Sequence, residues 1–411
     1  MDAQGFVNLL AAAVKHKVSD IHLHPGSPPA FRVKGDLVAV KAAALTEADM
    51  HVVLSVIISD PVWKAKIAEI KDYDGSFEVQ GLSRFRFNVF RHCGKLGAIM
   101  RLIPAQVPSL DGMGLPPVLK KISDNQRGLV LVTGATGSGK SSTLAAMIDH
   151  INTNYGSHIL TIEDPLEFIH TAKKARLTQR AIGPDTVSFA GALRSALRQD
   201  PDIILVGEMR DPETIDIALK AAETGHMVFS TVHTQDAMKT IGRLIAVFPP
   251  EEQRMVRQRL ADNLQAIVSQ RLVKRADGKG LIAAQEIMVS NMSIAECIAD
   301  PAKTGEMNDY IQKSREMTGG QTFDQHLAEL YQSGTIALET AMEAASNPSD
   351  FQRNLSFGAG GVSGAAKAPA NGNANGSGGN GATPPDANKA AFAEHTVVLD
   401  FAKEKEKDKA A

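Results

Sequence analysis

The sequence predicts an α/β protein with two folded domains and a disordered C-terminal tail, and three observations predict it. Four apolar runs typical of buried strands begin at residues 129, 158, 203 and 226 and alternate with helical patterns. A proline-rich segment separates them from an N-terminal region of shorter, alternating strands. Over 358–411 the chain is rich in glycine, alanine, asparagine and proline, so burial cannot offset its ordering entropy. A length of 411 residues leaves room for two or three domains.

Composition excludes several classes of protein. A formal net charge of −2 gives no general attraction to nucleic acid or to an anionic membrane. The two cysteines, Cys93 and Cys297, lie far apart in sequence, which excludes a disulfide framework and a four-cysteine zinc site. The N-terminal pattern is that of an amphipathic helix, not a signal peptide, and no apolar run reaches the roughly 20 residues of a membrane span. We therefore expect a soluble, cytoplasmic protein.

Residues 1–104 are expected to form a small α/β domain. His22 and His24 share the polar face of one of its strands, but no third ligand is near them in sequence, which favours a solvated face over a metal site. The expected elements are a helix over 6–14, a strand over 20–24, a hairpin of 30–34 and 37–40, and a helical stretch over 45–66 that breaks at residues 60–61.

Arginines lie on two further strands of this domain. The stretch 84–90 alternates strictly, with Arg84 and Arg86 opposite its apolar face, and Arg101 lies in the strand expected over 97–103. Taken alone, such arginines indicate a solvated strand face. The alternative is that one of them is delivered in trans to the γ-phosphate of a neighbouring subunit.

The second domain is expected over 118–350, after a linker of proline-rich sequence over 105–117. It contains a phosphate-binding loop between the buried strand 129–132 and a helix, with the spacing glycine, four residues, glycine, lysine, serine. The glycines let backbone N–H groups point into one concavity, and the helix adds its positive end. Lys140 is expected to reach the β- and γ-phosphates, and Ser141 to ligate Mg²⁺. The residues expected to hold ATP are Gly134, Ala135, Thr136, Gly137, Ser138, Gly139, Lys140, Ser141 and Ser142.

Three polar elements follow the later strands of this domain. An acidic group ending in Glu167 follows the strand 158–162, and Glu208 follows the strand 203–206, where a Walker B element belongs. Glu208 is the candidate to act through Mg²⁺ or to orient the attacking water. A fourth strand has His226 at its start and His233 at its end, and the second of these is a candidate γ-phosphate sensor. Beyond these, we expect one long helix over 251–273 and short elements to about residue 345.

The order of these four elements resembles the secretion and pilus ATPase superfamily, and within it the type IV pilus retraction ATPases, the twitching motility proteins. The likeness covers residues 1 to about 345. It includes the stretches 19–23, 192–198 and 206–210, which read SDIHL, ALRSALR and VGEMR.

The resemblance implies a homohexameric ring of RecA-like ATPase domains, each with a PAS-like N-terminal domain, that binds ATP and Mg²⁺ between the two domains and drives pilus retraction. It also implies work at the inner membrane with a pilus platform protein and other pilus machinery. Glu167 would aid water activation, and Glu208, the Walker B glutamate, would share Mg²⁺ with Ser141. The remaining residues implied to act on the nucleotide are His226 and His233 of the histidine box and Arg84, Arg86 and Arg101 of the N-terminal domain.

Two departures bear on the direction of the motor. Assembly ATPases usually have a large extra N-terminal region and a four-cysteine zinc site, and their absence from this sequence favours retraction. The stretch 293–300, SIAECIAD, has alanines at 295 and 299, where retraction ATPases carry arginines, so an accessory or assembly ATPase stays as an alternative.

Two other functions are weighed. A nucleic-acid-stimulated translocase is disfavoured by the net charge and by the lack of interleaved basic and aromatic residues. A nucleotide-dependent binding switch without turnover needs neither Glu167 nor Glu208, so their presence favours an ATPase.

Overall fold

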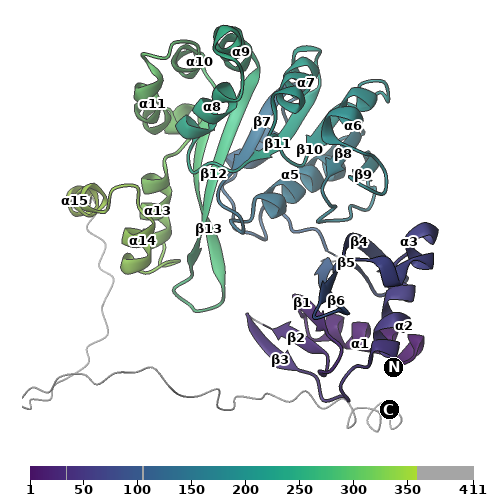
Figure 1. The fold of residues 1–411 in the computed structure, drawn as a ribbon. Coiled ribbons are helices and arrows are strands. Elements are labelled where there is room, and N and C mark those ends of the chain that lie inside the picture. Colours follow the sequence, from purple (N-terminus) through teal and green to yellow (C-terminus); the bar gives the residue numbers. More distant parts are fainter. Residues whose placement is uncertain (34, 104–105, 359–411) are drawn as a thin grey trace, which may run out of the picture. The chain divides into compact units, whose positions relative to one another are not determined.

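The computed structural model describes residues 1–33, 35–103 and 106–358. They divide into two compact units, one before and one after residue 104 (Figure 1). Both units combine helices with a sheet, which confirms the predicted α/β class. The expected tail over 358–411 lies outside the described residues, apart from Gly358 at the end of a helix.

The first unit is a six-stranded antiparallel sheet with helices, in the strand order β3-β2-β1-β6-β5-β4. Its elements are α1 (Ala3–Lys15), β1 (Asp20–Leu23), β2 (Ala30–Val33), β3 (Asp36–Ala39), α2 (Glu47–Ile57), α3 (Pro61–Ala65), the 3-10 turn η1 (Ile67–Glu69), β4 (Asp72–Val79), β5 (Ser83–His92) and β6 (Lys95–Ile103).

Alternation along β5 separates the core of this unit from its polar face. Phe85, Phe87 and Val89 are fully buried and pack with apolar residues of α1 and α2, whereas Arg84 and Arg86 point to the other face. A strand with one buried face has this period of two.

The second unit is built on a seven-stranded sheet in the order β13-β12-β7-β11-β10-β8-β9. Its strands are β7 (Gly128–Thr133), β8 (His158–Glu163), β9 (Arg176–Ala181), β10 (Ile203–Val206), β11 (Met227–Val232), β12 (Leu264–Lys274) and β13 (Leu281–Val289). Its helices are α4 (Val118–Ser123), α5 (Lys140–Asn154), α6 (Phe189–Ala196), α7 (Pro212–Glu223), α8 (Ala237–Ala246), α9 (Pro250–Asn263), α10 (Met292–Ala299), η2 (Thr304–Glu306), α11 (Met307–Lys313), α12 (Arg315–Thr318), α13 (Phe323–Gln332), α14 (Leu338–Ala344) and α15 (Pro348–Gly358).

All neighbouring strands of this sheet are parallel except β12 and β13, which form an antiparallel pair. Helices α4 and α5 cover one face, and α6 to α11 cover the other (Figure 1). Helices α13, α14 and α15 pack in a separate apolar cluster with β12 and β13. Because β7, β11, β10 and β8 are adjacent and parallel, the loops after their C-terminal ends gather at one edge of the sheet.

The long helix expected over 251–273 is wrong in its second half. Helix α9 ends at Asn263, and 264–274 form β12, a parallel neighbour of β7. Strand β12 is buried on both faces, so its apolar residues form a run that also fits the helical spacing of α9. Strands β4 and β9 were not predicted either.

The segment expected as a linker packs against the second unit. Its described residues, 106–117, have no regular structure, but Leu110 and Leu115 are buried in the same cluster as α4 and α5. The prolines and glycines of this segment disfavour helices and strands, but they do not keep its leucines out of the hydrophobic core.

Candidate functional site

The phosphate-binding loop connects β7, all six residues of which are buried, to the N-terminus of α5. Gly134, Gly137 and Gly139 all have positive φ angles, of 146°, 79° and 85°. A Cβ atom on Gly134 would lie 2.4 Å from Oγ of Ser138 and 2.5 Å from the carbonyl oxygen of Gln270. Glycine is therefore required there by the backbone angle and also by the close approach of its neighbours.

Lys140 is the first residue of α5 and lies folded against the loop. Its Nζ donates hydrogen bonds to the carbonyl oxygens of Gly134 and Ala135, both at 3.0 Å. Burial lowers the pKa of the lysine, and the charges of Glu167 and Glu208 oppose that effect. The fold thus brings both predicted carboxylates within electrostatic range of the lysine.

Gln270 of β12 lies directly against the loop, and sequence reasoning missed it. Its Nε2 donates to the carbonyl oxygen of Ser138 at 2.6 Å, and its Oε1 accepts from the hydroxyl of Thr143 at 3.0 Å. A cavity of about 460 Å³ adjoins the loop, and its lining consists of Gly134, Ala135, Thr136, Gly137, Ser138, Gln235, Gln270, Arg271 and Leu272.

Glu208 follows β10 and forms a small charged group with two neighbours. One carboxylate oxygen lies 2.6 Å from Nε of Arg210 and 3.6 Å from Nε2 of His233. Burial and the charge of Lys140 lower the pKa of His233, and Glu208 opposes them. A neutral imidazole can donate through one nitrogen and accept through the other, which suits a sensor beside a phosphate.

Two glutamates lie at the C-terminal end of β8: Glu163 is its last residue and Glu167 follows it, and only Glu167 was predicted as a site residue. Glu167 is exposed, whereas the carboxyl of Glu163 accepts a hydrogen bond of 2.7 Å from Thr161. Burial of the Glu163 carboxyl raises its pKa to about 7. Of the pair, Glu167 is the carboxylate free to meet a ligand.

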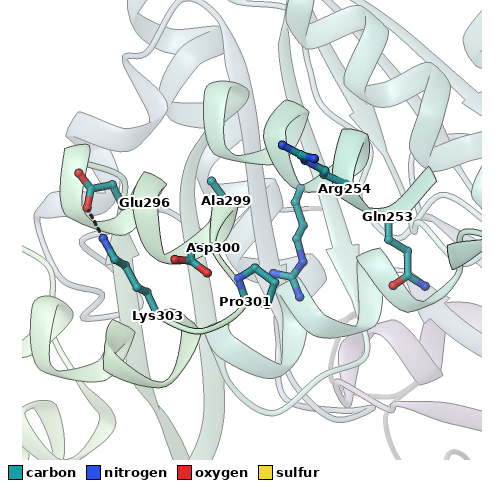
Figure 2. Close-up of a pocket in the computed structure, with 8 residues that line it drawn as sticks. Gln253, Arg254, Glu296, Ala299, Asp300, Pro301 and Lys303 are labelled. Atoms are coloured by element: carbon teal, nitrogen blue, oxygen red, sulfur yellow. Dashed lines mark hydrogen bonds and ion pairs between the residues drawn. The ribbon is translucent and has the colours of Figure 1, made fainter. Parts of the chain in front are cut away.

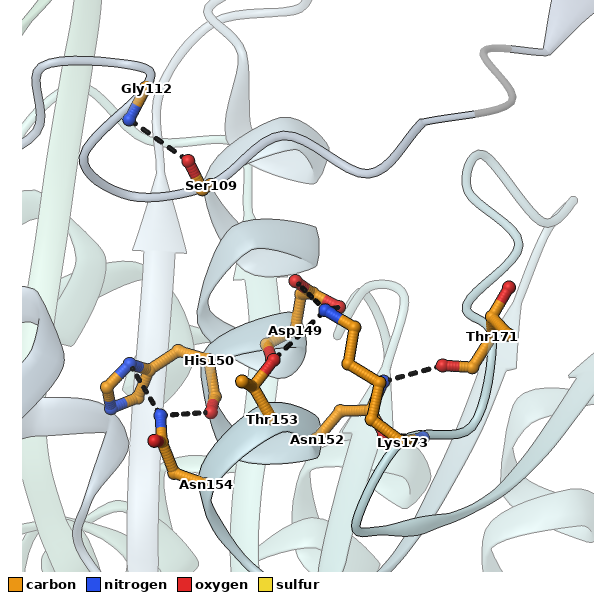
Figure 3. A network of polar contacts seen from close by, with 9 residues as sticks. All are labelled: Ser109, Gly112, Asp149, His150, Asn152, Thr153, Asn154, Thr171 and Lys173. Atoms are coloured by element: carbon orange, nitrogen blue, oxygen red, sulfur yellow. Dashed lines mark hydrogen bonds and ion pairs between the residues drawn. The ribbon is translucent and has the colours of Figure 1, made fainter.

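The segment that follows Glu167 is tied to the far end of α5. Nζ of Lys173 contacts both carboxylate oxygens of Asp149 at 2.8 Å, and Nδ2 of Asn152 donates to the carbonyl oxygen of Thr171 at 2.8 Å (Figure 3). The helix that begins in the phosphate loop therefore also restrains the segment just after Glu167.

His226 does not join this site within one chain. It precedes β11, and its carbonyl oxygen accepts from the first residue of β7, so it lies at the opposite edge of the sheet from His233. Six residues of strand separate the two edges by about 20 Å. The ring of His226 instead contacts the carbonyl oxygen of Ala221 and the hydroxyl of Thr224, and these contacts connect it to the C-terminal end of α7. Within one chain the structure therefore does not bring His226, predicted together with His233 to act on the nucleotide, to the edge where His233 lies.

The predicted arginines lie on the polar face of the first unit. Arg86 and Arg101 are directly opposite each other on β5 and β6, and Arg101 is opposite Asp20 on β1. Nε of Arg101 lies 2.9 Å from a carboxylate oxygen of Asp20, yet 67% of the arginine side chain is exposed. Arg84 donates to the hydroxyl of Ser76 at 2.8 Å. Asp20 thus orients Arg101 and leaves the end of its guanidinium accessible.

The stretch 293–300 lies in α10, apart from Asp300 just after the helix, and it lines a separate pocket of about 680 Å³ (Figure 2). Across that pocket, α9 presents Arg254 and Arg257, while α10 and the segment after it present Glu296, Asp300 and Lys303. Nζ of Lys303 pairs with Glu296 at 3.1 Å. Cations are therefore present here on α9, although positions 295 and 299 of α10 are alanine.

The residues at the loop fit a polyphosphate and a divalent cation. Oγ of Ser138 is buried without a hydrogen-bond partner among the described residues, and the loop glycines leave a cradle that a side chain would fill. Mg²⁺ is ordinarily held by one or two protein oxygens together with phosphates and water, a role that Ser141 and Glu208 are able to fill. In the part of the chain that the structure describes, no helix has the length and apolarity to cross a membrane.

Comparisons with known proteins show the family to which the chain belongs. Residues 5–354 match the family described as type II/IV secretion system protein. The chain is 48% identical, over 84% of its length and 98% of the relative, to the type IV pilus retraction ATPase PilT of Pseudomonas aeruginosa. It is 45% identical, over 78% of its length and 84% of the relative, to a twitching motility protein of Neisseria gonorrhoeae.

A solved structure extends the likeness to the fold. The crystal structure of a pilus retraction motor, PilT with bound ADP, superposes with a TM-score of 0.78 at 41% identity, over 86% of this chain and 99% of that one.

Proposed function

The chain belongs to the type II/IV secretion system protein family, and on that premise we propose that it is an ATP-hydrolysing motor that drives retraction of type IV pili. The observation that carries the proposal is the 48% identity along nearly the whole of a pilus retraction ATPase. The conformation of the phosphate loop, with Lys140 hydrogen-bonded to it at the start of α5, supports the ATP-binding part of the proposal.

The reaction is transfer of the γ-phosphoryl group of ATP to water. The loop N–H groups and Lys140 hold the phosphates, and Glu208 accepts a hydrogen bond from the attacking water and orients it. Glu167 assists at the same edge of the sheet, and His233 senses the γ-phosphate beside Glu208. Ser141 and Glu208 would hold Mg²⁺, which would supply positive charge against the phosphates when bound. His226 lies at the other edge and has no part in this step.

Six copies form a ring, and the first unit of one copy serves the nucleotide of another. Arg101, with Arg84 and Arg86 beside it, supplies positive charge to the γ-phosphate in trans. The support for this role is the exposed guanidinium that Asp20 orients. Closure around ATP and opening after hydrolysis turn the reaction into rigid-body motion.

The motor works in the cytoplasm at the inner membrane, where it acts on the pilus machinery through a platform protein. This part of the proposal rests on the family resemblance alone.

The test is the number of surface pili, counted by electron microscopy, in a strain that lacks this gene. More pili together with lost surface motility are expected, because pili that cannot retract accumulate. Few or no pili would mean that the motor assembles them, and the retraction function would be wrong.

The alternative is an accessory ATPase of the same family. It is favoured by the alanines at positions 295 and 299 of α10, where retraction ATPases carry arginines. In that case, deletion would leave the pilus number near that of the parent strain and weaken only retraction under load.

A further inference from the structure

We propose that Gln270 is a positioning residue for nucleotide binding, and that its side-chain amide fixes the Ser138–Gly139 peptide of the phosphate loop in its binding orientation. The inference rests on the proposed ATPase function and adds to it a residue from outside the phosphate-loop motif.

Gln270 is almost completely buried, with 1% of its surface exposed, and each of its polar side-chain atoms has a partner. Nε2 donates to the carbonyl oxygen of Ser138 at 2.6 Å. Oε1 accepts from the hydroxyl of Thr143 at 3.0 Å and from Nε2 of Gln285 at 3.1 Å. A buried amide with this many partners has one orientation available to it.

The assignment of nitrogen and oxygen in this amide follows from its partner. The oxygen of Ser138 belongs to a backbone carbonyl, which accepts hydrogen bonds and never donates them. The atom of Gln270 that faces it is therefore the nitrogen, and the oxygen faces Thr143 and Gln285.

The bond to Ser138 determines where the next N–H group points. In a planar trans peptide, the carbonyl oxygen and the following N–H lie on opposite sides. Because the Ser138 carbonyl points toward Gln270 of β12, the N–H of Gly139 points away from that strand and into the concavity of the loop. A loop peptide turned the other way would present a carbonyl oxygen to a phosphate, which repels it.

The loop glycines indicate the same tight fit. A Cβ atom on Gly139 would lie 3.2 Å from Nε2 of Gln270, and one on Gly134 would lie 2.5 Å from the backbone oxygen of Gln270. Two glycines of the loop, Gly134 and Gly139, thus pack closely against Gln270.

Contacts behind Gln270 hold it in place. Gln285 of β13 donates to it, and the backbone nitrogen of Gln285 donates to Nδ1 of His326 on α13 at 2.9 Å. Burial lowers the pKa of His326 to about 4, so its ring is neutral and accepts this bond at physiological pH. Gln270 is therefore supported by strand and helix, so it is a rigid base for the loop.

The test compares Gln270→Met with Gln253→Met in the full-length protein. Both substitutions remove a side-chain amide that donates to a backbone carbonyl, but Gln253 of α9 donates to Phe248 and belongs neither to the loop nor to the contacts around Gln270. Mg-ADP affinity is measured by calorimetry, and kcat and KM are measured for ATP hydrolysis. Melting temperatures without nucleotide compare the structural cost of the two changes.

Gln270→Met is expected to weaken Mg-ADP binding and to raise KM by about tenfold, the effect of losing about 1.4 kcal/mol. The value of kcat is expected to change by less than about threefold, because the loop holds the phosphates equally before and during the reaction. Gln253→Met is expected to leave affinity and KM unchanged. Equal losses of affinity in the two variants, or none in Gln270→Met, would overturn the proposal.

Thr143→Val provides a second route if Gln270→Met does not fold. It removes the hydroxyl that orients the Gln270 amide, so it is expected to weaken Mg-ADP binding by about threefold. If Gln270→Met does fold, adding Thr143→Val to it is expected to have less than the effect of Thr143→Val alone, because both act on one hydrogen-bonded unit. Full additivity, or unchanged affinity in Thr143→Val, would refute the role. A wild-type protein that neither binds Mg-ADP nor hydrolyses ATP would refute the ATPase function instead.

Discussion

Replacing Glu286 by glutamine is expected to stabilise the protein at pH 8 and to have little effect at pH 5. Glu286 lies on β13 with 6% of its surface exposed, and its carboxylate accepts from the backbone nitrogen of Ala237, the first residue of α8, at 2.8 Å. Burial raises the pKa of Glu286 to about 7, with a further contribution from Asp236, while Arg271 opposes the shift. The substitution keeps an oxygen for Ala237 and removes the charge.

The size of the effect follows from proton linkage. The folded protein holds this proton up to about pH 7, whereas the carboxyl in the unfolded chain loses it near the ordinary glutamate pKa of 4.5. Between these values the folded state binds more protons, so stability falls as the pH rises, and the loss is complete above pH 7. Since one pKa unit corresponds to about 1.4 kcal/mol, the ionised carboxylate costs the folded state about 3 kcal/mol at pH 8 and less than about 1 kcal/mol at pH 5.

The assay is urea unfolding of both proteins at pH 5, 6, 7 and 8, followed by circular dichroism and extrapolated linearly to water. Glu286→Gln is expected to be more stable than wild type by about 2 to 3 kcal/mol at pH 8, and the difference should shrink toward pH 5. Glu343→Gln, which removes the same charge from an exposed position of α14, is the control and should show no such trend. A stability difference that is the same at pH 5 and pH 8 would refute the reasoning.

Two predictions concern the reaction itself. Glu208→Gln is expected to leave ATP binding intact and to lower turnover by roughly two orders of magnitude or more, because the carboxylate that orients water is lost; unchanged turnover in a steady-state assay would remove Glu208 from this role. Arg101→Ala subunits mixed with wild type are expected to lower ATPase activity below the wild-type fraction, since each would impair a neighbour's site. Activity strictly proportional to the wild-type content would argue against a residue acting in trans.

The site residues that were predicted lie within, or directly after, patterns that can be recognised in a short stretch of the sequence. The phosphate loop is a contiguous motif between a strand and a helix, and Glu208 and His233 each follow an apolar strand. Parallel strands end at one edge of a sheet, so their positions in sequence were enough to expect them together. The same rule explains His226, since a residue that precedes a strand lies at the opposite edge.

The residues that were missed depend on contacts far apart in sequence. Gln270 is 132 positions from Ser138, to whose carbonyl oxygen it donates, and Glu286 is 49 positions from Ala237, from whose N–H it accepts a hydrogen bond. Neither has a neighbouring motif, and a buried glutamine or glutamate in an apolar run looks like an interruption of the pattern. Such residues become recognisable only when the strand order places β12 beside β7 and β13 beside β12.

Because residues 251–273 were predicted as one helix, strand β12, which connects these contacts, was not predicted. In a helix, Ser269 and Gln270 would lie about 100° apart around the axis, which suggests no common role for them. In β12 they point to opposite faces of the sheet beside the end of β7: Gln270 meets the phosphate loop, and Ser269 accepts from the hydroxyl of Thr133 at 3.0 Å. Ser269 is also paired in register with Glu286, which holds the start of α8, just beyond His233. Consecutive residues of one strand therefore connect the loop that binds phosphate with the helix after the proposed sensor. Disruption of the contact between Gln270 and Ser138 is accordingly expected to affect the contact between Glu286 and Ala237 through β12.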